Sequence, residues 1–401
     1  MAINPIRGRR SPLFVVATIL FVFVAGGVTG AVVDHAVSHG TPSGTGSKAQ
    51  ATNGSSSTTN APTTSSTLTP PALSVASVTP ANGATGVAPN APITVTLSAA
   101  LSQSSPLPVL SPTTPGSWRT SGDSLIFTPS PDFVPLSDIT LTLLSGAAGI
   151  LSKAGGYLAQ TVTEQFQVAN GSIVRLQQLL SLLDYSPLAW DAAGAPIAPT
   201  DSEAQTAALY KPPAGNFAWR ERGWPARLVA LWRPGIDNVF TRGLIMSFQA
   251  DHELTTNGAM GASLWTTLLA ALASNTLNTG GYNYGLADKA TPESLTVYHD
   301  GRIVVQTPAN TGIGASPTPD GTFPVFERLR QQVMRGTNPD GQPYADLVQY
   351  IAYFHGNDAV HYMDRADYGI PQSLGCIELP LADAARVWPY LAYGTLVTII
   401  N

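Results

Sequence analysis

The spacing of hydrophobic and polar positions changes several times along the chain, and each change predicts a different kind of element. Between residues 72 and 169, short segments alternate apolar and polar side chains, as residues 93–97 and 139–143 do. Alternation with period two is typical of strands with one buried face, and turn-forming stretches separate these segments. Several such strands in succession predict a β-sandwich over residues 72–169.

Residues 171–273 change to a helical period. Apolar residues recur at helical spacing in segments 173–180 and 243–250, and residues 254–265 are expected to form a tight turn that opens a final helix to about residue 272, which gives three predicted helices. A stretch of about fifty residues, 187–238, separates the first two and contains Trp190, Trp219, Trp224 and Trp232. Aromatic side chains of this kind either form a surface for sugar or peptide, or pack an insertion onto its neighbours.

The end of the chain predicts a second β-rich domain. Residues 274–290 are rich in Gly and Asn and are expected to form a linker. Within residues 291–401, segments 295–298 and 302–307 flank an Asp-Gly pair, which is typical of a hairpin with a type I′ turn. The only helical pattern in this domain is at residues 381–390.

The N-terminal region predicts a membrane anchor. Three arginines among residues 1–10 precede an uncharged apolar run at residues 11–33, whose 23 residues would span about 34 Å as a helix. This length exceeds a hydrocarbon core of about 30 Å, and the arginines place the tail 1–10 in the cytoplasm. A cleaved signal peptide is the alternative, although its apolar region is usually about 7–15 residues. Residues 34–71 have the composition of a disordered Ser/Thr/Pro linker.

Composition excludes several classes of function. The net charge is −5 and 11% of the residues are charged, so no basic surface for nucleic acid is indicated. The single cysteine excludes an internal disulfide and a cysteine-based zinc site. Because no ligand pair has the spacing of a metal motif, we expect neither a metal nor a cofactor.

The single cysteine is also the candidate nucleophile. Cys376 follows Gly375, and His361 precedes it by 15 residues. The thiolate is the nucleophilic form, and an ordinary Cys pKa of about 8.5 means that a nearby base must generate it. A free cysteine is otherwise a small buried hydrophobic residue.

Four ordered segments of the last domain resemble the L,D-transpeptidase catalytic domain. They are residues 311–323, residues 353–361 with Ala-Val-His at the end, the Ser-Leu-Gly-Cys-Ile-Glu-Leu motif at 373–379, and residues 394–397. Two upstream regions also resemble known modules: residues 72–169 are similar to bacterial Ig-like spacer domains, and residues 171–273 to a small helical peptidoglycan-binding module interrupted by the long insertion. The expected fold is therefore multi-domain and mainly β, with a transmembrane helix before the folded domains.

The resemblance implies a cell-wall enzyme. In this family a cysteine attacks the amide before the terminal D-Ala of a tetrapeptide stem, and an amine of a second stem then resolves the thioester into a 3→3 cross-link. Carried over by motif position, Cys376 is the nucleophile and His361 the base. The N–H groups of Gly375 and Cys376 are the oxyanion donors, and Ser373 lies at the acyl site.

The same resemblance sets the expected partners. These are peptidoglycan stem peptides as donor and acceptor, carbapenem-type β-lactams as inhibitors, and the cell membrane through the N-terminal helix, with the body outside the cytoplasm. Two other functions stay open: an L,D-carboxypeptidase, which uses water in place of the amine, and a wall-binding scaffold without catalysis.

Two features depart from the family pattern. Leu374 stands where the family usually has His, and only eleven residues separate His361 from Ser373, which predicts a reduced loop over the cleft. His355 is the competing base, although the apolar strand before His361 favours the latter. Tyr353, His355 and Leu374 are expected to line the substrate cleft.

Overall fold

The computed structural model of the protein describes residues 69–401. The predicted tail 1–10, the predicted membrane helix 11–33 and most of the predicted linker 34–71 lie outside the described residues and stay predictions. Within residues 69–401, no helix combines the length and the apolar character needed to cross a bilayer.

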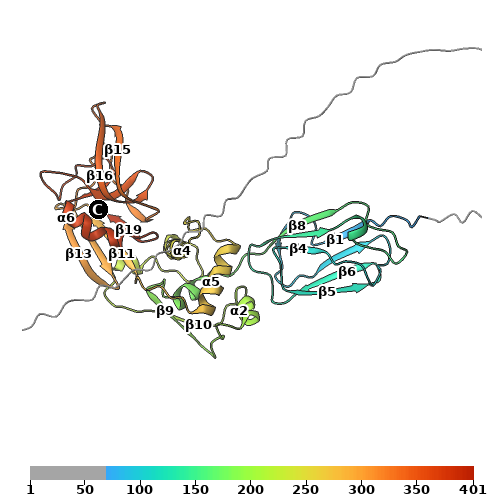
Figure 1. Cartoon of the computed structure of the whole chain (residues 1–401). Helices are drawn as coiled ribbons and strands as arrows, with labels where there is room; N and C mark the ends of the chain where they lie inside the picture. The colour runs from blue at the N-terminus through green and yellow to red at the C-terminus, as the bar shows by residue number, and fades with distance from the viewer. Residues whose placement is uncertain (1–68) are drawn as a thin grey trace, which may run out of the picture. The chain divides into compact units, whose positions relative to one another are not determined.

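The first domain consists of two four-stranded sheets around one core (Figure 1). One sheet has the order β1 (Val75–Thr79), β3 (Ile93–Leu97), β6 (Ser124–Pro129) and β5 (Gly116–Ser121). The other has the order β2 (Ala84–Val87), β8 (Val162–Val168), β7 (Asp138–Leu143) and β4 (Val109–Ser111). Alternate residues of β3 and β7 are buried in the shared core, so the predicted β-sandwich is confirmed.

Three helices follow, as the helical spacing predicts. They are α1 (Ile173–Leu182), α4 (Val239–Asp251) and α5 (Ala262–Ser274). The insertion between α1 and α4 forms the two-stranded sheet of β9 (Leu188–Ala192) and β10 (Gly215–Trp219), with the short helices α2 (Ser202–Ala208) and α3 (Ala226–Val229).

The tryptophans of the insertion pack into this part of the protein. Trp224 is buried in the core of the helices, and Trp219 and Trp232 pack against the same core. The ring of Phe217 lies 4.9 Å from Trp190 and 4.9 Å from Trp232, centroid to centroid. Aromatic contacts at this separation are typical of packed clusters, so the structure favours packing over an exposed binding surface.

The last domain contains a five-stranded and a four-stranded sheet. The first has the order β13 (Arg302–Pro308), β12 (Ser294–His299), β11 (Asn283–Asp288), β19 (Leu396–Ile400) and β14 (Gly321–Pro324). The second has the order β15 (Glu327–Thr337), β16 (Pro343–His355), β17 (Asp358–Tyr362) and β18 (Ile377–Leu379). Helix α6 (Leu381–Val387) continues into a 3-10 turn at Trp388–Tyr390, and Asp300 and Gly301 have the positive φ angles of the predicted hairpin turn.

The linker predicted at residues 274–290 is wrong in its second half, because β11 lies there. This strand is the middle strand of its sheet, antiparallel to β12 and parallel to β19. Tyr284 and Ala287 are fully buried, and Gly285 between them is buried as well. A central strand that is covered on both faces shows no alternation, and Gly and Asn made this one look like a loop.

The two faces of the four-stranded sheet have different roles. Phe354, Val360 and Ile377 project into the domain core. Tyr353, Ala359 and Cys376 belong to a separate cluster, which follows from the alternation of side chains along a strand. The pleat therefore directs the cysteine away from the core and onto the opposite face of the sheet.

The helices contact the last domain where two glycines meet. A Cβ atom at Gly394 would collide with the carbonyl oxygen of Gly243 and with Ser247, whose Oγ donates to the carbonyl of Tyr393 at 2.9 Å. Gly394 also has φ +79°, which disfavours other residues. The close approach fixes the turn that leads into β19.

We expect Gly394→Ala to lower the free energy of unfolding of the last domain by about 2–4 kcal/mol, because backbone strain adds to the collision. Gly341→Ala is the matched control, since Gly341 has φ +84° but no atom near its Cβ position. In the control the free energy of unfolding should fall by only about 1–2 kcal/mol, because backbone strain is the only cost there. Hydrogen exchange of β11 and β19 would measure both, and equal losses would contradict this account of the junction.

Candidate active site

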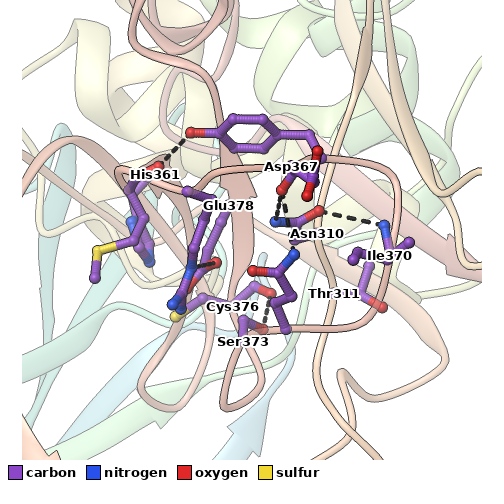
Figure 2. A network of polar contacts seen from close by, with 12 residues as sticks. Asn310, Thr311, His361, Asp367, Ile370, Ser373, Cys376 and Glu378 are labelled. Carbon is purple, nitrogen blue, oxygen red and sulfur yellow. Dashed lines mark hydrogen bonds and ion pairs between the residues drawn. The ribbon is translucent and has the colours of Figure 1, made fainter.

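A tight turn carries the cysteine into β18. Ser373 is fully buried, and its Oγ donates to the carbonyl of Cys376 at 2.6 Å while it accepts from the N–H of Gly375 at 3.2 Å (Figure 2). Gly375 has φ +118°, and a Cβ atom there would meet the carboxylate of Asp358. Only glycine therefore fits this position, and the serine acts on the backbone of the turn.

This geometry differs from two expectations. Ser373 was expected at the acyl site, but it lies beneath the turn with no exposed surface. The N–H of Gly375 was expected to bind an oxyanion, but it donates to the serine hydroxyl. In this structure the serine therefore orients the backbone of the turn and already engages the amide of Gly375.

A buried polar network, which no sequence motif indicates, holds the segment before the turn (Figure 2). Asn310 exchanges two backbone hydrogen bonds of 2.9 Å with Glu378. Its side chain donates to the carbonyl of Asp367 at 3.0 Å and accepts from the N–H of Gly369 at 2.9 Å. The carbonyl of Thr311 accepts from the N–H of Ser373 at 2.9 Å. These hydrogen bonds thus connect the loop before Cys376 to residues about sixty positions earlier in the chain.

A cleft of about 850 Å³ opens on the face of the sheet that carries Cys376. Four of the predicted site residues line it together: Cys376, His361, Tyr353 and Leu374. The hairpin of β15 and β16 forms one wall, where the hydroxyl of Tyr353 donates to Oε1 of Gln332 at 2.8 Å. A long hairpin therefore borders the cleft, although the segment between His361 and Ser373 is short.

His355, the competing base, is placed differently. Among the described residues that line the cleft, His355 is absent. It is exposed, its Nδ1 lies 3.1 Å from Oδ2 of Asp358, and its ring lies 4.8 Å from that of Phe323. The arrangement is that of a turn at the end of the β16–β17 hairpin, which leaves His361 as the histidine in the cleft.

The tautomer of His361 follows from its surroundings. This side chain is 3% exposed, and its Nδ1 lies 2.9 Å from the carbonyl oxygen of Tyr362. A carbonyl only accepts, so Nδ1 carries a proton and Nε2 keeps its lone pair when the ring is neutral. Burial lowers the pKa of His361 below its usual value, which outweighs the hydrogen bond to Tyr362 and the charge of Glu378. His361 is therefore a neutral base whose free nitrogen is Nε2.

The thiol is also neutral. Burial raises the pKa of Cys376 to about 12, and the carboxylates of Asp358 and Glu378 act in the same direction. A hydrogen bond from the backbone of Ala359 favours the thiolate but does not offset the burial. The resting site therefore holds a thiol and a neutral imidazole, so the proton must move when a substrate is bound.

Sequence reasoning missed an ion pair in the same cleft, formed by the buried Glu378 and the half-buried Arg365. Nε and Nη2 of Arg365 donate to the two carboxylate oxygens of Glu378, each at 2.7 Å. Both residues line the cleft with Cys376 and His361. The position of Glu378 two residues after the cysteine on a strand was the available signal, because alternate residues share a face. Within residues 69–401, no group of three His, Cys, Asp or Glu side chains could hold a metal ion.

We expect Ser373→Ala to slow the reaction of Cys376 with an acylating β-lactam at least about tenfold, because both the amide of Gly375 and the carbonyl of Cys376 lose a buried partner. The unmade bonds should also cost about 1–3 kcal/mol of stability. Ser316→Ala is the control, since this hydroxyl makes a single bond of 2.9 Å to the carbonyl of Leu374. Mass spectrometry of the adduct measures the rates, and unchanged acylation in Ser373→Ala would contradict the role of the serine.

Two family models match the chain. Residues 283–399 match the L,D-transpeptidase catalytic domain, and residues 67–168 match the bacterial Ig-like domain. Neither range includes the helical region, so its resemblance to a peptidoglycan-binding module stays a prediction. No curated protein matches the chain.

Several solved structures are similar to the chain. The L,D-transpeptidase from Mycobacterium smegmatis is 16% identical over 82% of this chain and 100% of that chain, with a TM-score of 0.28. L,D-transpeptidase 3 from Mycobacterium tuberculosis is 15% identical over 82% and 99%, with a TM-score of 0.28. The catalytic domain of the E. faecium L,D-transpeptidase, acylated by ertapenem, is 27% identical over 30% and 98%, with a TM-score of 0.27.

The family models and the ordered motifs agree on the same segment. The last domain of this chain is therefore an L,D-transpeptidase catalytic domain, and residues 67–168 are a bacterial Ig-like domain.

Proposed function

We propose that this protein is an L,D-transpeptidase that forms 3→3 cross-links between peptidoglycan stems through a thioester on Cys376. The observation that carries the proposal is that the only cysteine of the chain shares one cleft with a buried, neutral His361. A thiol beside a base with a free nitrogen is the minimum that nucleophilic acyl transfer needs.

The first half-reaction starts from the neutral pair. Nε2 of His361 takes the proton of the Cys376 thiol while the sulfur attacks the carbonyl carbon of the amide before the terminal D-Ala. The C–N bond then breaks, His361 returns the proton to the leaving amine, and a thioester and free D-Ala result. Because the pKa of the thiol is about 12, a free thiolate would be rare at neutral pH, so proton transfer to His361 has to accompany the attack.

The negative charge of the tetrahedral intermediate needs a hydrogen-bond donor. The amide of Gly375 is engaged by Ser373, so we assign this role to the N–H of Cys376 itself. A donor of this kind typically contributes about 2.7–4 kcal/mol to lowering the barrier. The bonds from Ser373 fix the orientation of that amide, because they hold the backbone on both sides of it.

In the second half-reaction an amine of another stem attacks the thioester carbon. His361 takes the proton that this nitrogen loses, the C–S bond breaks, and the sulfur recovers the proton as a thiol. Water at the same position would give the carboxypeptidase reaction, because the acyl-enzyme is common to both. The size of the cleft suits a peptide segment, since ligand sites commonly enclose about 300–1,000 Å³.

We further propose that the folded domains act outside the cytoplasm at the cell wall and are attached to the membrane through residues 11–33. The arginines before this apolar run and the Ser/Thr/Pro-rich segment after it support the assignment. The Ig-like domain then lies between the predicted linker and the catalytic domain in the chain.

The high pKa of the thiol predicts an unusual alkylation profile. In the native protein, the rate of Cys376 alkylation by iodoacetamide should rise about tenfold per pH unit from about pH 7 to 10 without a plateau near 8.5, because the thiolate fraction is still increasing. The same chain in guanidinium is the control and should level off near the ordinary Cys pKa. A native plateau near 8.5 would contradict the burial of the thiol.

The proposed roles predict the behaviour of two variants towards imipenem. The full-length chain should take up one molecule per chain, Cys376→Ala should take up none, and His361→Gln should react about 10²–10⁴ times more slowly because the base is missing. Intact-protein mass spectrometry over time measures all three. An adduct that survives in Cys376→Ala would refute the assignment of the nucleophile.

Product analysis then separates the three functions. With a tetrapeptide donor and an amine acceptor, a transpeptidase releases D-Ala and gives a new amide. A carboxypeptidase gives the free tripeptide acid in place of the amide. A native protein that is inert to both imipenem and donor would instead support the wall-binding scaffold.

A further inference from the structure

The ion pair of Glu378 and Arg365 has no part in the mechanism above, although it lies in the same cleft. Glu378 is 4% exposed, and Arg365 binds both of its carboxylate oxygens at 2.7 Å. Taking a carboxylate out of water is costly, and an ion pair around it is weak evidence for added stability. A buried carboxylate at this place therefore calls for an explanation in the chemistry of the cleft.

The sheet register places this carboxylate beside the catalytic base. In the parallel pairing of β17 with β18, His361 is in register with Glu378. Registered residues of neighbouring strands project from the same face, and so do Cys376 and Glu378, which are two residues apart. His361, Cys376 and Glu378 therefore share the cleft face of the sheet (Figure 2), whereas Ile377 between them enters the core.

The charges around His361 favour one protonation state over the other. Glu378 raises the pKa of His361 against the larger effect of burial, whereas Arg365 acts in the same direction as burial and lowers this pKa by a smaller amount than Glu378 raises it. The other charged side chains that line the cleft are Arg335, Asp346, which acts on Arg365, and Asp358, which acts on Cys376. The titratable side chains of Tyr344 and Tyr353 line it as well. Of the carboxylates that line the cleft, Glu378 is the one in register with the imidazole.

We propose that Glu378 is a positioning residue of this active site: its carboxylate, held in place by Arg365, stabilises the imidazolium that forms on His361 while Cys376 attacks the substrate. The step is the one written above, in which the thiol proton moves to Nε2 and later to the leaving amine. Glu378 keeps its own charge throughout and touches no reacting atom. The inference rests on the proposed function, because it needs His361 to act as the base.

A substitution can remove the charge of Glu378 and keep the shape of its side chain. Glu378→Gln keeps the size of the side chain and an oxygen for Arg365, but it removes the negative charge. Without that charge the imidazolium is less favoured, so the pKa of His361 falls. A weaker base takes up the thiol proton less readily, and it also stays neutral to a lower pH.

The test is the pH dependence of imipenem acylation, measured on the full-length chain by mass spectrometry between about pH 4.5 and 8, the range in which histidines titrate. For Glu378→Gln we expect a plateau rate about tenfold below wild type and an acid limb displaced to lower pH, since this limb reports the free base. Arg365→Lys is the matched control, because it keeps a cation beside Glu378 and should leave the acid limb in place.

Each outcome decides one question. A lower plateau with an unmoved acid limb in Glu378→Gln would show a purely structural residue and overturn the inference. A wild-type chain that forms no adduct would overturn the proposed function, and the inference with it. If Glu378→Gln does not fold, the double variant Glu378→Gln with Arg365→Gln leaves no buried charge unpaired. Its acid limb should also move to lower pH, because Glu378 acts on His361 more strongly than Arg365 does.

Discussion

The parallel pairing of two short strands is the constraint on which the rest of the site depends. Strands β17 and β18 share three registered pairs, from Val360 with Ile377 to Tyr362 with Leu379. A shift by one residue would turn every side chain to the other face, which would bury the cysteine in the core and expose Ile377. Core packing of Val360, Ile377 and Leu379 therefore sets the register, and the register brings base and nucleophile into one cleft.

The connection between these strands would otherwise be the weak point of this arrangement. A parallel pair needs a crossover, and here residues 363–376 provide it without a helix or a strand of their own. Backbone groups of such a segment need partners, and Asn310 supplies three of them through its side chain. At the end of the segment, the hydroxyl of Ser373 supplies hydrogen-bond partners to the backbone of Gly375 and Cys376. The polar network thus gives an irregular crossover the precision that acyl transfer requires.

Sequence patterns predicted the parts of this fold that depend on local order. The period of two in the Ig-like domain, the helical period in α1, α4 and α5, and the Asp-Gly turn of the β12–β13 hairpin all follow from neighbours along the chain. The same patterns did not predict strand β11, because a strand buried on both faces needs no alternation of apolar and polar residues. Cys376 and His361 could be named from their motif, and the structure places them in one cleft. Asn310 and Arg365 could not, since their partners are set by the crossover, and for Glu378 the sequence offered only its position two residues after the cysteine.

Burial affects the chemistry of this site in two opposite ways. Burial raises the pKa of the thiol and lowers that of the imidazole, so it opposes the charge separation that starts the reaction. The same burial strengthens the effect of a fixed charge that faces the developing imidazolium. A single carboxylate would also repel the thiolate, as Glu378 does in raising the pKa of Cys376. Arg365 limits that repulsion, so the ion pair can favour the protonated base. The sulfur is repelled only briefly, because it loses its negative charge when it attacks the substrate.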